Sequence, residues 1–440
     1  MKANQLRQVW YVMLLVVAFI FFIFFTPDFS ILGHQFKKLN LVGDILMEKP
    51  VLQPKDSVIS VKDTVIELAP KNKPNRAYIE EFGRDNLSFF FEALRHSKAK
   101  PVRIAFFGDS FIEGDILCGP FRDTLQRIFG GSGVGYMPIT SEVTKFRTSI
   151  QHDFTRWQTF SMISQKNERA PLGLPGYCFL PVEGNEVVYK PVGKNFVTAK
   201  LFYESGKYAN VRFALNELLS EPVDLVPSVK LNQYELPGSG FNSVKLSFPY
   251  VDSVRVYGVA LEDSIGISVD NFSMRSNPGM GLLLVDRARM RQFDSLRNYN
   301  LVVLQYGLNV ISENDSSGYL WYLDKMVALI KRLKENFSNC GFLLVSVGDR
   351  CNNQNGKITT MPDVKVMRDI QRKIARKSGI AFWDMFEAMG GENGIRKYTE
   401  AQPPLAAKDY THLTFRGGKK IAKKLADALL YEKAKYDRKR

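Results

Sequence analysis

The chain has 440 residues and is 45% hydrophobic and 24% charged, a composition that excludes a fibrous or largely disordered protein. Its 60 Lys and Arg residues outnumber its 45 Asp and Glu residues, which gives a formal net charge of +15. Such an excess suits an acidic polymer, an anionic membrane surface or nucleic acid, but the sequence has no helix-turn-helix, zinc-finger or RNA-binding motif, so no nucleic-acid partner is expected.

The first apolar segment, Val9 to Phe25, is an uninterrupted run of 17 residues that follows Lys2 and Arg7. A helix of this length spans about 26 Å, close to the thickness of a bilayer core. Because no small-x-small cleavage site follows it, an uncleaved signal anchor is favoured over a cleaved signal peptide, which stays the alternative. We expect residues 1–27 to form a cytoplasmic tail and a transmembrane helix, and the proline-interrupted residues 28–77 to form a linker.

A strand, a turn and a helix follow the linker. Tyr78 to His96 has one apolar face, which predicts an amphipathic helix that covers the first strand. Val102 to Phe107 is typical of a buried parallel strand, and Cys118 to Phe129 has helical spacing. Between them, Gly108-Asp109-Ser110 places a serine at the carboxyl end of a strand, where open α/β sheets bind ligands. Asp109 can accept hydrogen bonds from nearby backbone N–H groups.

The middle of the chain has the pattern of an all-β protein. The glycine-rich stretch Gly130 to Tyr136 lacks a phosphate-binding lysine and is expected to be a loop at the mouth of the site. From Thr144 to Leu261, short alternating runs such as Phe196 to Phe202 predict strands separated by turns. We therefore expect residues 144–262 to form an inserted, jelly-roll-like β-domain.

Strands and helices alternate again from residue 263 to residue 440. This order predicts a parallel sheet with helices on both faces, so that residues 78–143 and 263–440 together form one three-layer α/β/α domain. The expected elements are strand Ile265 to Val269, helix Asp286 to Arg297, strand Leu301 to Tyr306, helix Gly318 to Asn336, strand Phe342 to Val347, helix Pro362 to Lys377, strand Ile380 to Trp383 and helix Arg416 to Glu432.

The histidines and cysteines are scattered. The four histidines have no metal-ligand spacing, and the four cysteines form neither a C-x-x-C motif nor a disulfide-dense pattern. We expect no metal and no cofactor. Cys340 and Cys351 flank a predicted strand and can pair only if the following loop folds back.

Three short motifs have the content of a serine-hydrolase site. They are Gly108-Asp109-Ser110, Gly307-Leu308-Asn309 directly after an apolar run, and Asp409-Tyr410-Thr411-His412 before the last helix. Taken singly, each has a structural explanation: a plain β–α turn, an asparagine that closes a turn, and a helix cap before Thr414. Taken together and in this order, they favour catalysis.

The three motifs resemble those of the SGNH (GDSL) hydrolase family in content, order and position. Within that family the chain looks most like the peptidoglycan O-acetylesterases, which carry a β-sandwich, carbohydrate-binding-like domain between their first two strands. The resemblance implies a flavodoxin-like sheet, with Ser110 as nucleophile, His412 as general base and Asp409 as the residue that orients the base. It also implies an oxyanion hole formed by the Ser110 and Ser276 N–H groups and the Asn309 amide.

Two positions depart from the family pattern. Ser276 stands where the family has a glycine that donates its backbone N–H, and Val310 replaces the aspartate that usually follows the asparagine. The second departure removes a supporting hydrogen bond. Proton transfer does not depend on either position. His412 can take the proton of Ser110 with one ring nitrogen while Asp409, three residues earlier, accepts a hydrogen bond from the other ring nitrogen of His412.

These observations predict a serine esterase that removes O-acetyl groups from a cell-envelope glycan. We expect a single-pass protein of the bacterial cytoplasmic (inner) membrane with its catalytic domain in the periplasm or otherwise outside the cytoplasm. One alternative is an O-acetyltransferase that works beside a membrane-bound O-acyltransferase, and another is a non-catalytic glycan-binding protein. The β-domain is expected to bind the glycan or to serve as a rigid spacer, and its candidate exposed aromatic residues are Tyr203, Tyr208 and Trp157.

Overall fold

A computed structural model describes residues 10–11, 13–14, 29–31, 34–36, 78–141, 143, 146–163, 170–193, 195–250, 254–312, 317–354 and 356–439. The chain divides into two compact units, Met1–Ile66 and Glu67–Arg440. In the first unit, β1 (Phe29–Ile31) pairs antiparallel with β2 (His34–Phe36). The predicted anchor and linker lie almost wholly outside the described residues. Among those that are described, no helix has the length and apolar character needed to cross a membrane.

A six-stranded sheet forms the centre of the second unit. Its strands lie in the order β15 (Gly266–Ser273), β4 (Pro101–Gly108), β16 (Tyr299–Gln305), β17 (Gly341–Val345), β20 (Ala381–Trp383) and β3 (Ile79–Glu81). The first five are parallel and β3 is antiparallel. Numbered along the chain, the parallel strands have the flavodoxin-like order 2-1-3-4-5. The predicted parallel sheet is confirmed.

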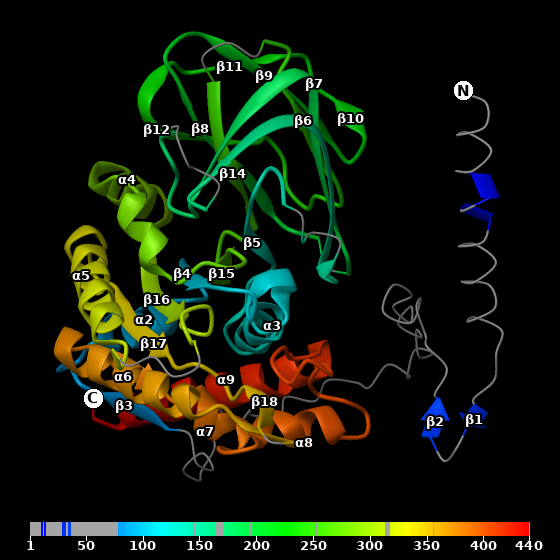
Figure 1. Cartoon of the computed structure of the whole chain (residues 1–440). Helices are drawn as coiled ribbons and strands as arrows, with labels where there is room; N and C mark the ends of the chain where they lie inside the picture. Colours follow the sequence, from blue (N-terminus) through cyan, green and yellow to red (C-terminus); the bar gives the residue numbers. More distant parts are fainter. Residues whose placement is uncertain are drawn as a thin grey trace, which may run out of the picture. The chain divides into compact units, whose positions relative to one another are not determined.

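Helices cover this sheet in two groups (Figure 1). In the first group, α9 (Phe415–Arg438) contacts both α2 (Ser88–Arg95) and α3 (Cys118–Phe129). In the second, α5 (Leu320–Asn336) contacts both α4 (Arg287–Arg297) and α6 (Pro362–Ser378). Shorter elements are η1 (Glu113–Asp115), η3 (Met280–Leu284), α7 (Met385–Met389), α8 (Gly394–Glu400) and the hairpin β18 (Cys351–Gln354) and β19 (Lys357–Thr360). All seven residues from Val102 to Gly108 are buried, as expected of a strand covered on both faces.

The predicted helix from Tyr78 to His96 is wrong in its first half. Residues Ile79–Glu81 form the edge strand β3, and the helix begins only at Ser88. Asp85 lies in the left-handed region with a φ of 54°, which interrupts a helix. The Asn86 side chain bonds both the carbonyl oxygen and the N–H of Phe342, so it joins this turn to β17 instead.

The inserted part is antiparallel throughout and has its own hydrophobic core, which confirms the predicted all-β domain. Ten strands form it: β5 (Gly133–Met137), β6 (Ile150–Ser161), β7 (Tyr177–Pro191), β8 (Thr198–Ser205), β9 (Ala209–Leu215), β10 (Leu218–Leu219), β11 (Val223–Leu225), β12 (Ser228–Glu235), β13 (Val244–Ser247) and β14 (Val254–Glu262). We refer to β5–β14 as the β-domain (Figure 1).

The glycine-rich stretch Gly130 to Tyr136 was expected to be a loop, but most of it forms β5, which pairs with β14. Gly131, Gly133 and Gly135 all have positive φ. A Cβ atom at Gly131 would lie 2.6 Å from the Ile267 nitrogen, so the chain can pass this close to β15 only with glycine there. The glycines therefore allow β5 to pass close to the backbones of β14 and β15, where the two sheets meet.

Candidate active site

Ser110 follows β4, at the point where the strand order of the parallel sheet reverses. Ligands of open α/β sheets bind at such a position because the loops on either side diverge there. Gly108 makes the turn possible, since a Cβ atom on it would lie 2.8 Å from the Gln305 carbonyl oxygen. The Asp109 carboxylate accepts the Phe111 N–H at 3.0 Å, so the turn after β4 has the hydrogen bond expected of it.

Ser110, His412 and Asp409 form one hydrogen-bonded row. The Ser110 Oγ lies 3.1 Å from the His412 Nε2, and the His412 Nδ1 lies 2.6 Å from an Asp409 oxygen. The Asp409 carboxylate also accepts the backbone N–H groups of Thr411 and His412. These bonds hold the imidazole so that its Nε2 faces the serine, which is the arrangement needed to take a proton from the hydroxyl.

The electrostatics of the row favour an ionised Asp409. Partial burial raises the pKa of this carboxyl, but the hydrogen bonds from the His412 ring and from two backbone N–H groups outweigh burial and lower its pKa below the usual value. The side chains of His412 and Asp409 are both about half exposed. Water can therefore reach the row directly.

The three groups expected to stabilise an oxyanion lie at the same edge of the sheet. Asn309 follows β16, the strand next to β4, and its Nδ2 donates to Asp109 Oδ2 at 3.3 Å. Ser276 has a φ of 60° in the loop after β15, a left-handed conformation that glycine adopts most easily. The Met274 N–H donates to the Gly108 carbonyl oxygen, which fixes this loop beside the turn that carries Ser110.

The contact between Asp109 and Asn309 can take the place of the hydrogen bond that an aspartate at position 310 would make. Val310 offers no hydrogen bond to the asparagine side chain, but the neighbouring carboxylate of Asp109 does. Asp109 is fully buried, and burial raises its pKa from 3.8 to about 7 despite the hydrogen bond from Phe111 and the nearby His412. The sequence indicated a turn-forming role for Asp109 but not this second contact.

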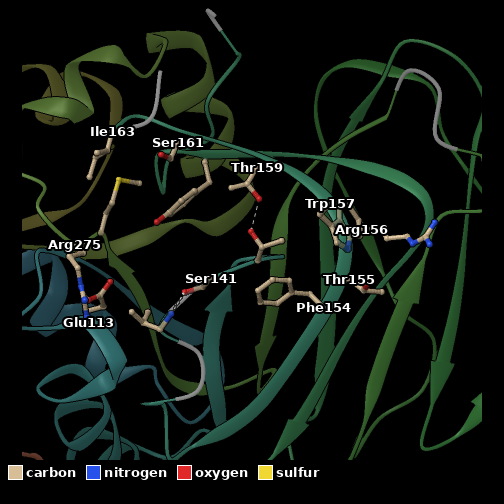
Figure 2. Close-up of a pocket in the computed structure, with 14 residues that line it drawn as sticks. Glu113, Ser141, Phe154, Thr155, Arg156, Trp157, Thr159, Ser161, Ile163 and Arg275 are labelled. Carbon is tan, nitrogen blue, oxygen red and sulfur yellow. Dashed lines mark hydrogen bonds and ion pairs between the residues drawn. The ribbon is translucent and has the colours of Figure 1, made fainter. Parts of the chain in front are cut away.

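A cleft of about 770 Å³ lies between the β-domain and the loop after β15. Ser110, His412 and Asp409 do not line it, but two of its lining residues are close to site residues in the chain: Glu113 comes three residues after Ser110, and Arg275 precedes Ser276. Glu113 of η1 and Arg275 form its wall on the side of the parallel sheet, where they make an ion pair of 2.8 Å. The facing wall is β6 with the first residue of β7. From β6 come Phe154, Thr155, Trp157, Thr159 and Ser161, which Figure 2 labels. From β7 comes a third aromatic side chain, Tyr177. Flat aromatic faces beside hydroxyl groups are suited to sugar rings.

The predicted aromatic residues of the β-domain have three different positions. Trp157 lies in the cleft, where its Nε1 donates to the Glu186 carbonyl oxygen. Tyr208 is 80% exposed but does not line the cleft. Tyr203 was predicted to be exposed, and this is wrong, because it is buried in the core of the β-domain.

All four cysteines are buried and free, so Cys340 and Cys351 do not pair. In the described part of the chain, no cluster of three or more His, Cys, Asp or Glu side chains could hold a metal ion.

Comparisons with known proteins bear on the fold. No protein-family model matches the chain, and no curated protein matches its sequence. Among solved structures, the chain is similar to a peptidoglycan O-acetylesterase, with a TM-score of 0.69 and 18% identity over 81% of this chain and 99% of the other. A family two carbohydrate esterase from Clostridium thermocellum, in complex with cellohexaose, is much less similar, with a TM-score of 0.27 and 11% identity over 62% of this chain and 99% of that one. The chain thus has the fold of the peptidoglycan O-acetylesterase. The matched 81% of its length is more than either the parallel-sheet part or the β-domain contains, so the match includes residues of both.

Proposed function

We propose that the protein is a serine esterase that removes O-acetyl groups from a cell-envelope glycan. The observation that carries this proposal is the row of Ser110, His412 and Asp409, with distances of 3.1 and 2.6 Å. The cleft whose wall includes Glu113, three residues after Ser110, gives a polymer room to lie on this side of the molecule. The shared fold of a peptidoglycan O-acetylesterase supports the choice of an acetylated glycan as substrate.

The first half of the reaction forms an acetyl-enzyme. His412 takes the proton of Ser110 as the serine oxygen attacks the acetyl carbonyl carbon, and the resulting imidazolium is stabilised by Asp409. The oxygen of the tetrahedral intermediate is negative and needs hydrogen-bond donors, and we assign this role to the Asn309 amide and the Ser110 and Ser276 N–H groups. One such donor typically lowers the barrier by about 3 kcal/mol. His412 then donates its proton to the departing sugar oxygen.

In the second half, water attacks the acetyl-enzyme with His412 again as the base, and acetate leaves. The half exposure of His412 and Asp409 supports hydrolysis, because water reaches the base without any movement of the chain. Transfer of the acetyl group to a sugar stays the alternative. It is separated from hydrolysis by measuring how much acetyl goes to water and how much to an added acceptor sugar.

The experiment that tests the function is acetate release from O-acetylated peptidoglycan and from O-acetylated xylan, with Ser110→Ala as the control. A serine-directed phosphonate should label the wild type at Ser110 and leave the variant unlabelled. If Ser110→Ala released acetate at the wild-type rate, the esterase proposal would be wrong.

Membrane anchoring is part of the proposal and rests on the apolar run Val9 to Phe25. With this anchor, the catalytic domain would lie outside the cytoplasm, where an envelope glycan is. Fractionation of cells that express the full chain should recover it with the membranes. Recovery of a soluble protein that starts near residue 27 would overturn this part of the proposal.

A further inference from the structure

Arg350 lies in the loop that follows β17, and its guanidinium has no partner among the residues that the structure describes. The side chain is partly buried. Across the described ranges of the chain, no carboxylate lies within ion-pair distance of it, and no hydrogen bond from its side chain is found. Partial burial removes water from the guanidinium. Because no protein acceptor replaces that water, the burial costs free energy.

The backbone on both sides of Arg350 is joined to the candidate site. Two residues before it, a Cβ atom on Gly348 would lie 3.4 Å from the ring of Phe111, the residue after Ser110. One residue after it, the Cys351 N–H donates to the carbonyl oxygen of Tyr410, two residues before His412. Arg350 therefore lies between the segment that carries the serine and the segment that carries the histidine.

The side chain of Arg350 is directed away from the interior. The Met361 N–H donates to the Arg350 carbonyl oxygen, which extends the β18–β19 pairing by one residue and makes this segment strand-like. Its neighbours Asp349 and Cys351 are buried on one side, where the Cys351 Sγ lies 3.7 Å from an Asp349 oxygen. Since successive side chains of a strand point to opposite sides, Arg350 points to the other.

Four other arginines near the site have acceptors in the protein. Arg275 pairs with Glu113, and Arg122 and Arg147 share Asp115 at 2.7 and 2.9 Å. Arg156, which lines the cleft, donates to the Glu183 carbonyl oxygen at 3.3 Å. Arg350 differs from these four, because its side chain has no acceptor among the described residues.

We propose that Arg350 binds an anionic group of the substrate, so that the esterase acts on an acidic glycan with a carboxylate or a phosphate near the acetylated sugar. This inference rests on the proposed esterase function and narrows its substrate class. A guanidinium presents a planar fork of donors that matches the oxygens of a carboxylate or a phosphate. The net charge of +15 would help to draw such a polymer to the protein.

The test compares the full-length wild type with Arg350→Gln and Arg350→Lys on four substrates. They are 4-nitrophenyl acetate, an O-acetylated manno-oligosaccharide without charge, an O-acetylated oligogalacturonide with carboxylates, and an O-acetylated glycerol-phosphate polymer with phosphates. The matched control is Arg127→Gln, an exposed arginine near the end of α3. The two acidic substrates show which anion Arg350 prefers.

For the wild type we expect a higher kcat/KM on one acidic substrate than on the neutral oligosaccharide, with a preference that decreases as salt is added. Arg350→Gln should lose about 10- to 100-fold in kcat/KM on that acidic substrate and less than about two-fold on the two uncharged esters. Arg350→Lys should recover part of the loss, because it restores the charge but not the fork. Arg127→Gln should leave all four values unchanged.

Two results would overturn the inference: a wild type without preference for either acidic substrate, or an equal loss by Arg350→Gln on charged and uncharged esters. Neither result would affect the esterase proposal, which depends on Ser110. If the wild type hydrolysed none of the four esters, the esterase proposal itself would fail.

Discussion

Replacement of Asp109 by asparagine tests whether the buried carboxyl beside Asn309 destabilises the fold when it ionises. Burial raises the pKa of Asp109 from 3.8 to about 7, so the folded protein holds its proton more tightly than the unfolded chain does. For a carboxyl whose pKa is raised on folding, the free energy of unfolding falls as pH rises above the unfolded pKa. It reaches its lowest level above the folded pKa.

The size of the effect follows from the two pKa values. Between pH 5 and pH 8, ionisation of Asp109 should lower the free energy of unfolding of the wild type by about 2 to 3 kcal/mol. Asparagine has no such ionisation, but one of its two polar atoms is a donor, so it cannot accept from both Phe111 and Asn309. That loss costs about 1 kcal/mol at any pH. The wild type has already lost about 1.5 kcal/mol by pH 5, because the unfolded carboxyl ionises near pH 4, and this offsets the cost. Asp109→Asn should therefore be close to the wild type in stability near pH 5 and exceed it by roughly 3 kcal/mol at pH 8.

Urea unfolding at pH 5, 6, 7 and 8 measures this difference, with Asp123→Asn as the control. Asp123 is exposed on α3, and its replacement should change stability little at any pH. The activity of Asp109→Asn should fall, since Asn309 loses the acceptor that orients its amide. A stability difference between Asp109→Asn and the wild type that does not vary with pH would refute the reasoning.

Three further predictions concern the site. Asn309→Ala should lower kcat by about 10²- to 10³-fold with little change in KM, because its donor bond strengthens only as the oxyanion forms; an effect on KM alone would contradict this. Asp409→Ala should retain more activity than His412→Ala in single-turnover acetate release, since Asp409 orients the base but moves no proton, and equal losses would argue against these roles. Trp157→Ala should raise KM for an acetylated polymer and spare 4-nitrophenyl acetate, whereas an equal effect on both would indicate that the cleft does not bind the chain of sugars.

The parallel-sheet part of the fold could be predicted because its signals are local. A strand covered on both faces is continuously apolar, and the runs at Val102 to Phe107 and Leu301 to Tyr306 became β4 and β16 within two residues at each end. The approach of Ser110 to Asn309 followed from the same prediction, since carboxyl ends of parallel strands lie at one edge. His412 and Asp409 come from a loop, and only the family resemblance indicated that they would meet the serine.

Other features could not be read from the sequence because distant contacts decide them. In β8, the five residues from Leu201 to Ser205 are all buried, so alternation does not show that Tyr203 lies inside. The glycines of β5 look like a flexible loop until the neighbouring strands that crowd them are known. The hairpin that places Arg350 is short and polar, and its contact with Tyr410 joins residues nearly sixty positions apart.

The position of the cleft relative to Ser110 depends on how firmly the β-domain is attached. Glu262, at the end of β14, is fully buried between Arg103 and Arg297, with distances of 2.9 and 2.8 Å. Burial raises the pKa of Glu262, but the two arginines outweigh it and hold that pKa well below its usual value. Arg297 also pairs with Asp270 of β15 at 2.8 Å, so these charges join β14 to three elements of the parallel-sheet part.

Removal of one member of such a buried set leaves the others without partners and typically costs about 3 to 5 kcal/mol. The β-domain is therefore held to the parallel-sheet part by buried charges and is not a module that could be cut away without loss of stability. These ion pairs oppose movement of β14 relative to the sheet that carries Ser110. A polymer held in the cleft would then present its acetyl groups to the serine in a register that the fold itself determines, and point substitutions in the cleft can test this where deletion of the domain cannot.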